Sequence, residues 1–539
     1  MPNAILQSAA EGADASAMNA PRPRVAVALF LFFFGLYGLT SSGNAFRVPD
    51  EFEVYFQAEH LVDAGDISVP QTLAIGQNGQ SIFFGRFGRD GRAYAPYGPG
   101  VAYAVAPFHL LGRAVAWAAG VPRRKLPNGI AWEFLVGGIT TLAMAFAAAL
   151  AVAGAFRAFR AAGASEHRSL RLALLLGGAT ILWPYAGTLY SEAWLAAACI
   201  WPAALLLEAR AGGATARPRV IAAAAFLVAA ILLKPTAVVI APGFVIAAVF
   251  DRTTAWPVRS RVALTLTAAI LLGGAAQAAW NIERFGSPLE FGYNLAGMVP
   301  HLPARAFSIA DLPRGVVVQL LSPGKALLVW APPLLLSLVA VRDAARREPA
   351  IVGGIACSFA AAVCFYAAFL YPEGGYAHGP RHLVPLVPIL LLPAAMSRTR
   401  FPRALVIGCA AIGIVVAGLA VAVSFFEDQS PPPGLAAASP YYDRIDPPPG
   451  RPFNQYRLDY VPFVTALSSG QWLAPNRPPG NGPDFFVAHL ARARRLLPGG
   501  STIPPWLPWA VGTPFGALLL VTGYWLKREW KSTMNRSKA

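Results

Sequence analysis

Long apolar runs separated by short polar connections dominate the chain. A helix needs about 20 mostly apolar residues to cross a bilayer, and a shorter run crosses with its polar flanks at the interfaces. Twelve runs approach that length, at residues 25 to 40, 129 to 155, 170 to 189, 193 to 207, 220 to 233, 236 to 250, 262 to 280, 325 to 341, 350 to 370, 383 to 397, 404 to 425 and 507 to 526. The pattern predicts an all-α polytopic membrane protein with about 12 transmembrane helices.

A thirteenth run, residues 98 to 120, is interrupted by Pro107, His109 and Arg113. If this run spans the membrane, the five arginine-rich connections that follow it lie on the external side. If it does not, they lie on the cytoplasmic side together with Arg22 and Arg24. Basic residues in short loops are typical of the cytoplasmic side, so we expect residues 98 to 120 to form an external juxtamembrane helix. The connections are residues 157 to 171, 210 to 219, 252 to 261, 342 to 347 and 398 to 403.

This topology divides the chain into four parts. Residues 1–24 form a cytoplasmic tail, and residues 25–425 a transmembrane module whose first external loop is 41–128. Residues 426–506 form a Pro-rich and aromatic-rich external C-terminal loop, and residues 507–539 the last transmembrane helix with a basic cytoplasmic tail. Aromatic residues are uncommon in flexible linkers, so we expect the 426–506 loop to be a folded cap.

Composition excludes several classes of protein. A chain that is 56% hydrophobic and 13% charged cannot cover a soluble globule with charged side chains. The net charge of +17 is explained by membrane orientation, so no nucleic-acid partner is expected. The four cysteines lie inside apolar runs, which is typical of small core residues. No phosphate-binding glycine loop, nucleophile elbow or dinucleotide fingerprint is found, so ATP is not implied.

Two adjacent carboxylates, Asp50 and Glu51, follow the first apolar run. Asp50 as N-cap with Glu53 three residues later is a capping box, which would open an amphipathic helix. That box does not need Glu51, although an acid in a first turn gains a little from the helix dipole. The alternative is a functional site at the outer face.

Glu192, in the motif TLYSEAW, lies at an outer helix end in the same topology. Its structural interpretation is a helix capped by Ser191 with an acid in the first turn. Its functional interpretation groups it with Asp50 and Glu51, because all three would share the outer face. Together they could bind a divalent cation through oxygen ligands, or one could be a general base.

Cationic residues share that face. Lys234 and Lys325 lie at external helix ends, where a lysine can simply extend toward the interface. Arg381, next to His378, follows a turn rich in glycine and proline that exposes backbone N–H groups, and a forked guanidinium there would suit a phosphate-type anion. The alternative is an ordinary loop arginine that contacts lipid headgroups. His378 and His382 have Pro380 between them, which argues against a helical zinc pair.

The ordered set of motifs resembles a known family. PDE follows the first span, and then come AYAPYGPG (93 to 100), TLYSEAW, NIERFGSPLEFGYN (281 to 294), SPGKALLVWAPPLLL and GGYAHGPRHLVPLVPIL. In this order the chain resembles bacterial membrane glycosyltransferases of the GT-C superfamily, which are similar to protein O-mannosyltransferases and lipid A aminoarabinose transferases. The resemblance extends to about residue 397 and has no counterpart for the 426–506 loop.

The resemblance implies a function. Such enzymes move a sugar from a polyprenyl-phosphate carrier to an acceptor hydroxyl on a glycan, lipid or protein at the outer face of the bacterial inner membrane. By position, Asp50 matches the catalytic base, Glu51 its acidic neighbour and Glu192 the second external acid. We assign Lys234, Lys325, His378 and Arg381 to the carrier phosphate on charge and topology. With one base and no separate nucleophile we expect inversion, no nucleotide cofactor, and a divalent cation as an open possibility.

Two other classes remain open. A secondary transporter would have as many spans, but its ionisable residues should lie at mid-membrane in a repeated architecture. A polyprenyl-linked glycan ligase or polymerase would share the carrier and the side of the membrane, and would consume an oligosaccharide diphosphate instead.

Overall fold

The computed structural model describes most of the chain. The described residues are 23–43, 49–71, 76–77, 80–81, 85–124, 129–212, 214–292, 307–369, 372, 374–375, 377–423, 464, 485–496 and 499–536. The predictions for residues 1–22 and for most of the 426–506 loop therefore lie outside the described residues.

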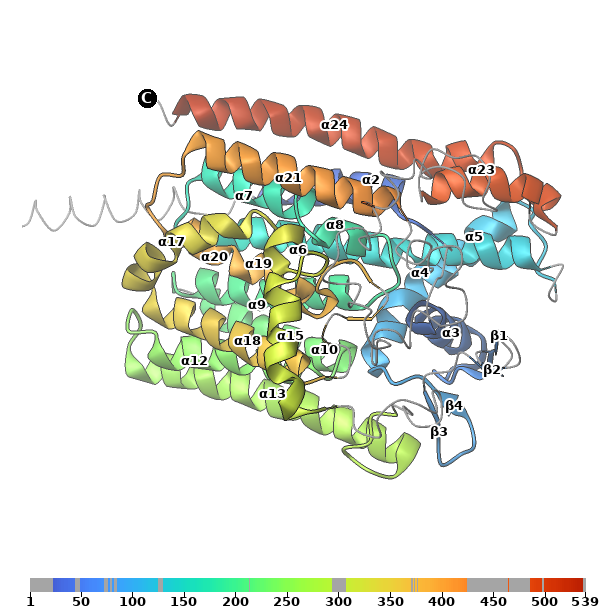
Figure 1. Ribbon diagram of the computed structural model, residues 1–539, viewed down its shortest axis with the longest axis horizontal. Helices are drawn as coiled ribbons and strands as arrows, with labels where there is room; N and C mark the ends of the chain where they lie inside the picture. Colours follow the sequence, from blue (N-terminus) through green and yellow to red (C-terminus); the bar gives the residue numbers. More distant parts are fainter. Residues whose placement is uncertain are drawn as a thin grey trace, which may run out of the picture.

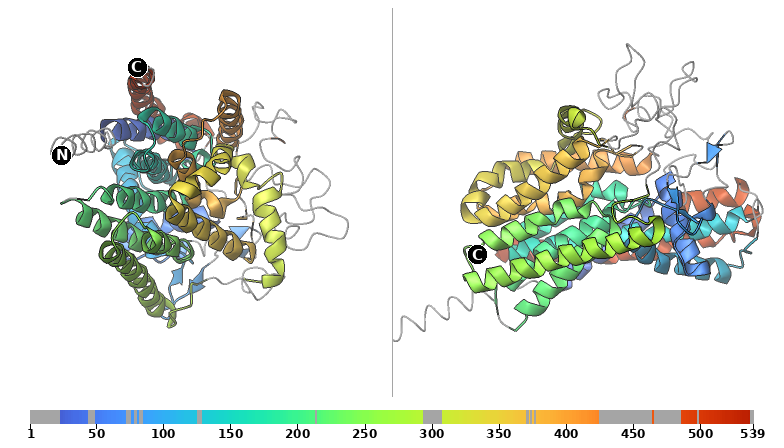
Figure 2. Two further views of the ribbon diagram at one scale, coloured as in Figure 1. Left: turned by 90° about the vertical axis from the view of Figure 1, so that its left-hand side faces the viewer. Right: turned by 90° about the horizontal axis from the view of Figure 1, so that it is seen from below.

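Long helices packed side by side build the molecule (Figure 1). They are α2 (Pro23–Thr40), α5 (Ile130–Thr140), α6 (Leu142–Ala161), α7 (Glu166–Gly178), α9 (Glu192–Ala209), α10 (Ala216–Leu233), α12 (Pro242–Phe250), α13 (Trp256–Phe285), α17 (Leu334–Arg347), α18 (Pro349–Ala367), α21 (Arg403–Ala422) and α24 (Leu507–Arg536). Helices α3 (Pro49–Ala64) and α15 (Leu312–Leu321) run across this direction (Figures 1 and 2). The all-α polytopic architecture is thereby confirmed.

The count of twelve long spans is not confirmed. Within the described residues, nine helices are long and apolar enough to cross a membrane, with α5 and α6 counted as one and α4 (Pro99–Ala118) included. Four predicted runs are instead interrupted. They are 170–189 (α7 and α8, Leu182–Tyr185), 236–250 (α11, Ala237–Ile240, and α12), 325–341 (α16, Leu327–Trp330, and α17) and 383–397 (η3, Arg381–Leu386, α19, Val387–Leu390, and α20, Leu392–Met396).

Proline explains these interruptions. Pro184, Pro242, Pro332 and the series that begins at Pro385 lie in or between the short pieces. Proline has no N–H to donate to the preceding turn and its ring clashes with that turn, so a helix ends or kinks there. Irregular backbone at membrane depth is tolerated where neighbouring protein covers it, and η3, α19 and α20 are largely buried here.

The five arginine-rich connections gather at one end of the bundle, which we call the basic end. Arg210 pairs with Asp251 at 2.9 Å and with Glu348 at 2.8 Å, which joins three connections. Arg168 donates to the carbonyl oxygens of Ala394 and Thr399, which joins the other two. The C-terminal part of α24 lies there too, since the rings of Trp530 and His167 are 4.3 Å apart.

The first helix starts at the same basic end. Helices α2 and α24 pack antiparallel, because Gly35 lies against Phe515 and Leu519 whereas Phe32 lies against Gly523. Arg24, at the start of α2, is therefore near the C-terminal part of α24 and on the side of the five connections.

Helix α4 belongs to the opposite end, which we call the site end. It starts against the last turn of α10, where a Cβ on Gly98 would lie only 2.0 Å from the carbonyl oxygen of Leu232. Farther along, Gly112 of α4 packs on Val136 of α5, and the chain after α4 leads directly to the start of α5 at Ile130. The chain therefore enters and leaves the 98–120 segment at one end of the bundle.

Short strands and one more helix complete the site end. Strand β1 (Gly76–Gln77) pairs with β2 (Gln80–Ser81), and β3 (Arg86–Phe87) pairs with β4 (Ala93–Tyr94), both antiparallel. Helix α23 (Phe486–Leu496), from the end of the 426–506 loop, docks there through Phe486, which is 1% exposed and whose N–H donates to Ser41.

The cysteines correct one expectation. Cys199 and Cys409 are buried as predicted and Cys357 is half-buried, but Cys364 is exposed, so it is not a core residue. Cys364 lies in α18, one of the helices apolar enough to span. All four are free thiols.

Candidate functional site

Asp50 is presented by the first turn of α3. The helix begins at Pro49, a residue favoured at the first helical position because its missing N–H would have no partner there. Asp50 is then the second helical residue, so the capping-box prediction is wrong. The Oδ1 atom of Asp50 is bound by a side chain from 331 residues farther along the chain instead of by its own helix.

Arg381 connects two acids from different parts of the sequence. Its Nη2 donates to Asp50 Oδ1 at 2.7 Å and its Nε donates to Glu192 Oε1 at 2.9 Å. The Glu192 side chain is 0% exposed and that of Asp50 is 25% exposed, so one acid is enclosed while the other borders the surface. A guanidinium fork suits this geometry because its nitrogens point in fixed directions.

Lys234 adds a second cation. Its Nζ lies 2.6 Å from Glu192 Oε1, so both cations use the same carboxylate oxygen. The other oxygen, Oε2, is buried and has no hydrogen-bond partner among the described residues. Ser191 precedes α9, but its side chain makes no capping hydrogen bond, so capping does not explain Glu192.

A glycine-rich turn holds Arg381 in position. Gly374 has φ +88°, a conformation that residues with a Cβ rarely adopt, and a Cβ there would lie 2.6 Å from the Cβ of Arg381. Gly379 has φ +53° and packs on the ring of Trp330. The two glycines therefore let the backbone of the turn lie close to the side chains of Arg381 and Trp330.

Lys325 and His378 make contacts within the turn and with its neighbours. Lys325 Nζ donates to the carbonyl oxygens of Gly375 and Ala377. The His378 ring lies 5.5 Å from the Trp330 ring, and its carbonyl oxygen accepts a hydrogen bond from the Tyr185 hydroxyl. A role for these two residues in carrier binding stays a prediction.

Glu51 contacts the loop before α9. Its side chain is 1% exposed and its Oε1 accepts a hydrogen bond from the backbone N–H of Leu189 at 3.2 Å. This contact ties the first turn of α3 to the TLYSEAW motif. The role of Glu51 as a supporting neighbour of Asp50 stays a prediction.

One aromatic residue of the site was not singled out from the sequence. The Arg381 guanidinium carbon lies 4.1 Å from the centre of the Tyr190 ring, a cation–π geometry. The sequence signal was present, because Tyr190 lies two residues before Glu192 in the quoted motif. Without the fold, nothing indicated that its ring would face an arginine of the 374–382 turn.

A second polar group lies farther along α3. Glu59 is buried and accepts a hydrogen bond from Gln71 Nε2 at 3.1 Å. Burial raises the pKa of Glu59 to about 7, with the nearby charges of Glu133 and Asp63 acting in the same direction. Arg123, which pairs with Asp63 at 2.6 Å, opposes that rise.

The acids do not assemble a metal site in the described part of the chain. No group of three or more His, Cys, Asp or Glu side chains there could hold a metal ion. Asp50 and Glu192 are both bound to Arg381, and Glu51 is bound to backbone. Of the two alternatives for these acids, a joint site for a divalent cation is therefore not seen among the described residues.

Most of the quoted sequence motifs meet at the site end. Arg284, from NIERFGSP, donates to the carbonyl oxygen of Ala95 in AYAPYGPG at 3.0 Å and stacks over Tyr94, Trp280 and Phe285. PDE meets TLYSEAW through Glu51, and TLYSEAW meets the 374–382 turn through Arg381.

Comparisons with known proteins give structural matches only. No protein-family model matches the sequence, and no curated protein matches it. The structure is similar to that of ArnT from Cupriavidus metallidurans in the apo state, with 18% identity, a TM-score of 0.45, and coverage of 93% of this chain and 76% of that chain. The same protein bound to undecaprenyl phosphate matches with a TM-score of 0.41, 18% identity and the same coverage. An archaeal oligosaccharyltransferase, AglB from Archaeoglobus fulgidus in complex with an inhibitory peptide and a dolichol-phosphate, matches with 12% identity, a TM-score of 0.41, and coverage of 74% of this chain and 55% of that chain.

Proposed function

We propose that the protein is a membrane glycosyltransferase that moves a sugar from a polyprenyl-phosphate carrier to an acceptor hydroxyl. The observation that carries this proposal is the Arg381 guanidinium, which contacts both Asp50 and Glu192 beside Lys234 at one end of an apolar helix bundle. Such a transfer needs a partly exposed carboxylate beside a cation, which Asp50 and Arg381 supply, and Lys234 adds a second cation on the neighbouring acid Glu192. The order of motifs that resembles the GT-C superfamily supports the same reaction.

In the proposed reaction the acceptor oxygen attacks the anomeric carbon of the donor. The bond from that carbon to the phosphate oxygen breaks, and its electron pair leaves with the phosphate. Asp50 accepts the acceptor's proton, a contribution of about 10²- to 10⁴-fold for a well-placed general base. Attack from the side opposite the phosphate inverts the anomeric centre.

Arg381 would couple donor binding to activation of the base. Its Nη2 donates to Asp50 Oδ1. A donor phosphate competes for that nitrogen, because charge-assisted hydrogen bonds from a guanidinium to phosphate are strong. The Nε bond to Glu192 keeps the guanidinium in place while Asp50 becomes free to accept a proton. Fixed positive charge then lies where negative charge develops on the leaving phosphate.

We also propose that the site end faces the periplasm. The arginine-rich connections and the Arg24 end of α2 lie together at the basic end, and basic residues in short connections favour the cytoplasmic side. The chain would then be a multi-pass inner-membrane protein with its N-terminus in the cytoplasm. Lipid carrier and acceptor would meet at the outer leaflet.

The direct test is donor consumption by the purified full-length protein in lipid nanodiscs. Polyprenyl-phosphate monosaccharides are supplied, and the release of free polyprenyl phosphate is followed by mass spectrometry of the lipid fraction. Parallel reactions contain an oligosaccharide linked to polyprenyl diphosphate, or a nucleotide sugar. We expect release only from the monophosphate-linked donors. Consumption of the diphosphate donor alone would assign the protein to the ligase or polymerase class instead.

A further inference from the structure

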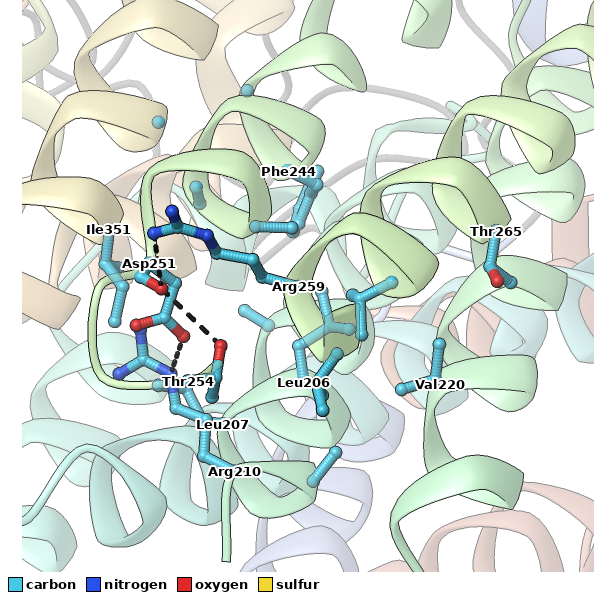
Figure 3. A pocket seen from close by; sticks show the side chains of 18 of the residues that line it. Leu206, Leu207, Arg210, Val220, Phe244, Asp251, Thr254, Arg259, Thr265 and Ile351 are labelled. Carbon is cyan, nitrogen blue, oxygen red and sulfur yellow. Dashed lines mark hydrogen bonds and ion pairs between the residues drawn. The ribbon is translucent and has the colours of Figure 1, made fainter. Parts of the chain in front are cut away.

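Figure 3 shows a cavity of about 670 Å³. Because Arg210, Asp251 and Arg259 line it, it lies at the basic end, away from the ion pairs of Asp50 and Glu192. Its walls come from α9, α10, α12, α13 and α18, and most of the lining side chains are apolar. This volume is within the range of about 300 to 1,000 Å³ that is usual for small-molecule sites. The proposed glycosyl transfer takes place at the other end and does not use this cavity.

One side of the cavity is cationic. Arg210, Arg217, Arg259 and Arg261 line it together with a single acid, Asp251. The carboxylate of Asp251 is bound by Arg210 at 2.9 Å, so it does not balance the other three arginines. Figure 3 shows Arg210, Asp251, Thr254 and Arg259 gathered at one side and apolar side chains such as Leu206 and Val220 at the other.

Arg259 keeps hydrogen-bonding capacity. Its Nη1 makes one long contact of 3.4 Å, to the carbonyl oxygen of Asp251, and its guanidinium lies over the Trp256 ring at 4.9 Å. Its Nε is buried and has no hydrogen-bond partner among the described residues. The protein therefore leaves much of the donor capacity of this guanidinium unused, and an acceptor that reaches its terminal nitrogens from the cavity would be favoured.

The apolar side of the cavity opens toward the lipid. Three of its lining residues are large, apolar and well exposed, namely Ile221 at 54%, Val258 at 51% and Leu264 at 70%. They belong to α10 and α13, which are both apolar enough to span the membrane. Ile221 and Leu264 lie inside the predicted spans 220 to 233 and 262 to 280, where the surroundings in a bilayer are hydrocarbon, so an acyl chain can pass from the bilayer into the cavity.

We propose that this cavity binds one anionic phospholipid, with its phosphate on Arg259 and an acyl chain between α10 and α13. A free phosphate would leave the apolar walls unfilled. An uncharged amphiphile would leave Arg217, Arg259 and Arg261 without a counter-charge among the described residues, whereas Arg210 already pairs with Asp251 and Glu348. The cytoplasmic leaflet is rich in anionic lipid, and the proposed topology puts the basic end there. Lipid at this position would fill the space between α10, α12, α13 and α18.

The test is native mass spectrometry of the full-length protein titrated with phosphatidylglycerol or with phosphatidylcholine of the same acyl chains. For the wild type we expect one phosphatidylglycerol to be retained in preference to phosphatidylcholine. Arg259→Gln should lower that preference by roughly fivefold, the effect of one arginine near an anionic headgroup. Arg252→Gln is the matched control, because Arg252 is exposed in the same connection but does not line the cavity. It should leave the preference unchanged.

A second variant tests the acyl position independently of charge. Val220→Trp fills the apolar side and should lower retention of both lipids, with the elution profile of the protein unchanged. Equal retention of the two lipids by the wild type would overturn the proposal. So would wild-type retention by Val220→Trp, or an equal loss of preference in Arg252→Gln and Arg259→Gln.

Discussion

Each end of α9 carries a triad made of one buried glutamate and two cations, and the two triads differ in whether both carboxylate oxygens are bound. Glu192 is the first residue of the helix and Glu208 lies near its last, roughly 24 Å away at 1.5 Å per residue. Both side chains are almost fully enclosed, with 0% exposed for Glu192 and 3% for Glu208. Each is paired with two cations, Lys234 and Arg381 at the site end and Arg157 and Arg219 at the basic end.

At the basic end both carboxylate oxygens are used. Arg157 binds Glu208 with two parallel hydrogen bonds, Nε to Oε1 at 2.9 Å and Nη2 to Oε2 at 2.7 Å, and Arg219 lies 3.3 Å from Oε2. Arg157 also stacks over Trp201. Such a forked, two-bond pair fixes neighbouring helices with respect to one another and leaves the acid no free acceptor atom.

At the site end the triad is incomplete. Both cations converge on Oε1 of Glu192, while its Oε2 has no hydrogen-bond partner in the described part of the chain. Arg381 in addition reaches Asp50, which borders the surface. We therefore propose that the triad of Glu208 is structural, whereas that of Glu192 holds the cations that contact the carrier phosphate in the proposed reaction.

The largest expected effect is that of Asp50→Asn. This change keeps the size of the side chain but removes the proton acceptor, so turnover should fall by about 10²- to 10⁴-fold. The donor assay described above measures it. Binding of the carrier should be largely retained, because the proposed phosphate contacts are with Arg381 and Lys234.

Asp311→Asn is the control for that change. Asp311 is exposed just before α15 and is in no ion pair within the described residues. Its activity should equal that of the wild type. Turnover by Asp50→Asn at the wild-type rate would remove Asp50 from the role of base.

A smaller effect is expected from Glu192→Gln, and Glu208→Gln is its matched partner. Each change removes one buried charge from the same helix and leaves two cations behind, which costs stability in both cases. Only Glu192→Gln should also change catalysis, by about 10- to 100-fold, because Arg381 loses the contact that holds its guanidinium beside Asp50.

For Glu192→Gln and Glu208→Gln, we would measure the turnover number at saturating donor and the midpoint temperature of thermal unfolding. Similar losses of turnover in both variants would mean that the two triads are equivalent and would break the comparison. A loss of stability in Glu208→Gln without a loss of turnover would support a purely structural role for the triad of Glu208.

The hydrophobic pattern predicted the spans better than it predicted their continuity. Runs such as 193–207 and 262–280 became the single helices α9 and α13. The run 325–341 was counted as one span although Pro332 and Pro333 divide it into α16 and α17. Average hydropathy does not register a missing N–H, whereas a helix ends where that donor is lost.

The site shows a different limit of sequence reasoning. Asp50, Glu192, Lys234 and Arg381 were each identified by their charge near an apolar run, and these four do lie together. Which acid each cation binds could not be predicted, because 189 residues separate Arg381 from Glu192 and 331 separate it from Asp50. Lys325 and His378 have the same sequence signal, yet they contact the turn's backbone and Trp330.

The smallest expected effect concerns Glu59, also on α3. Its pKa is about 7 in the folded protein against an ordinary value of 4.5, so the folded state binds more protons than the unfolded state between those values. Stability should therefore fall as pH rises from about 4.5 to about 7 and then level off, by about 3 kcal/mol at most.

Glu59→Gln should remove this slope, because the amide stays neutral while its size is kept. Thermal midpoints measured across this pH range test the prediction, with exposed Glu283→Gln as the control that keeps the wild-type slope. An unchanged slope in Glu59→Gln would mean that another group titrates in this range and that the charge of Glu59 does not set the pH dependence of stability.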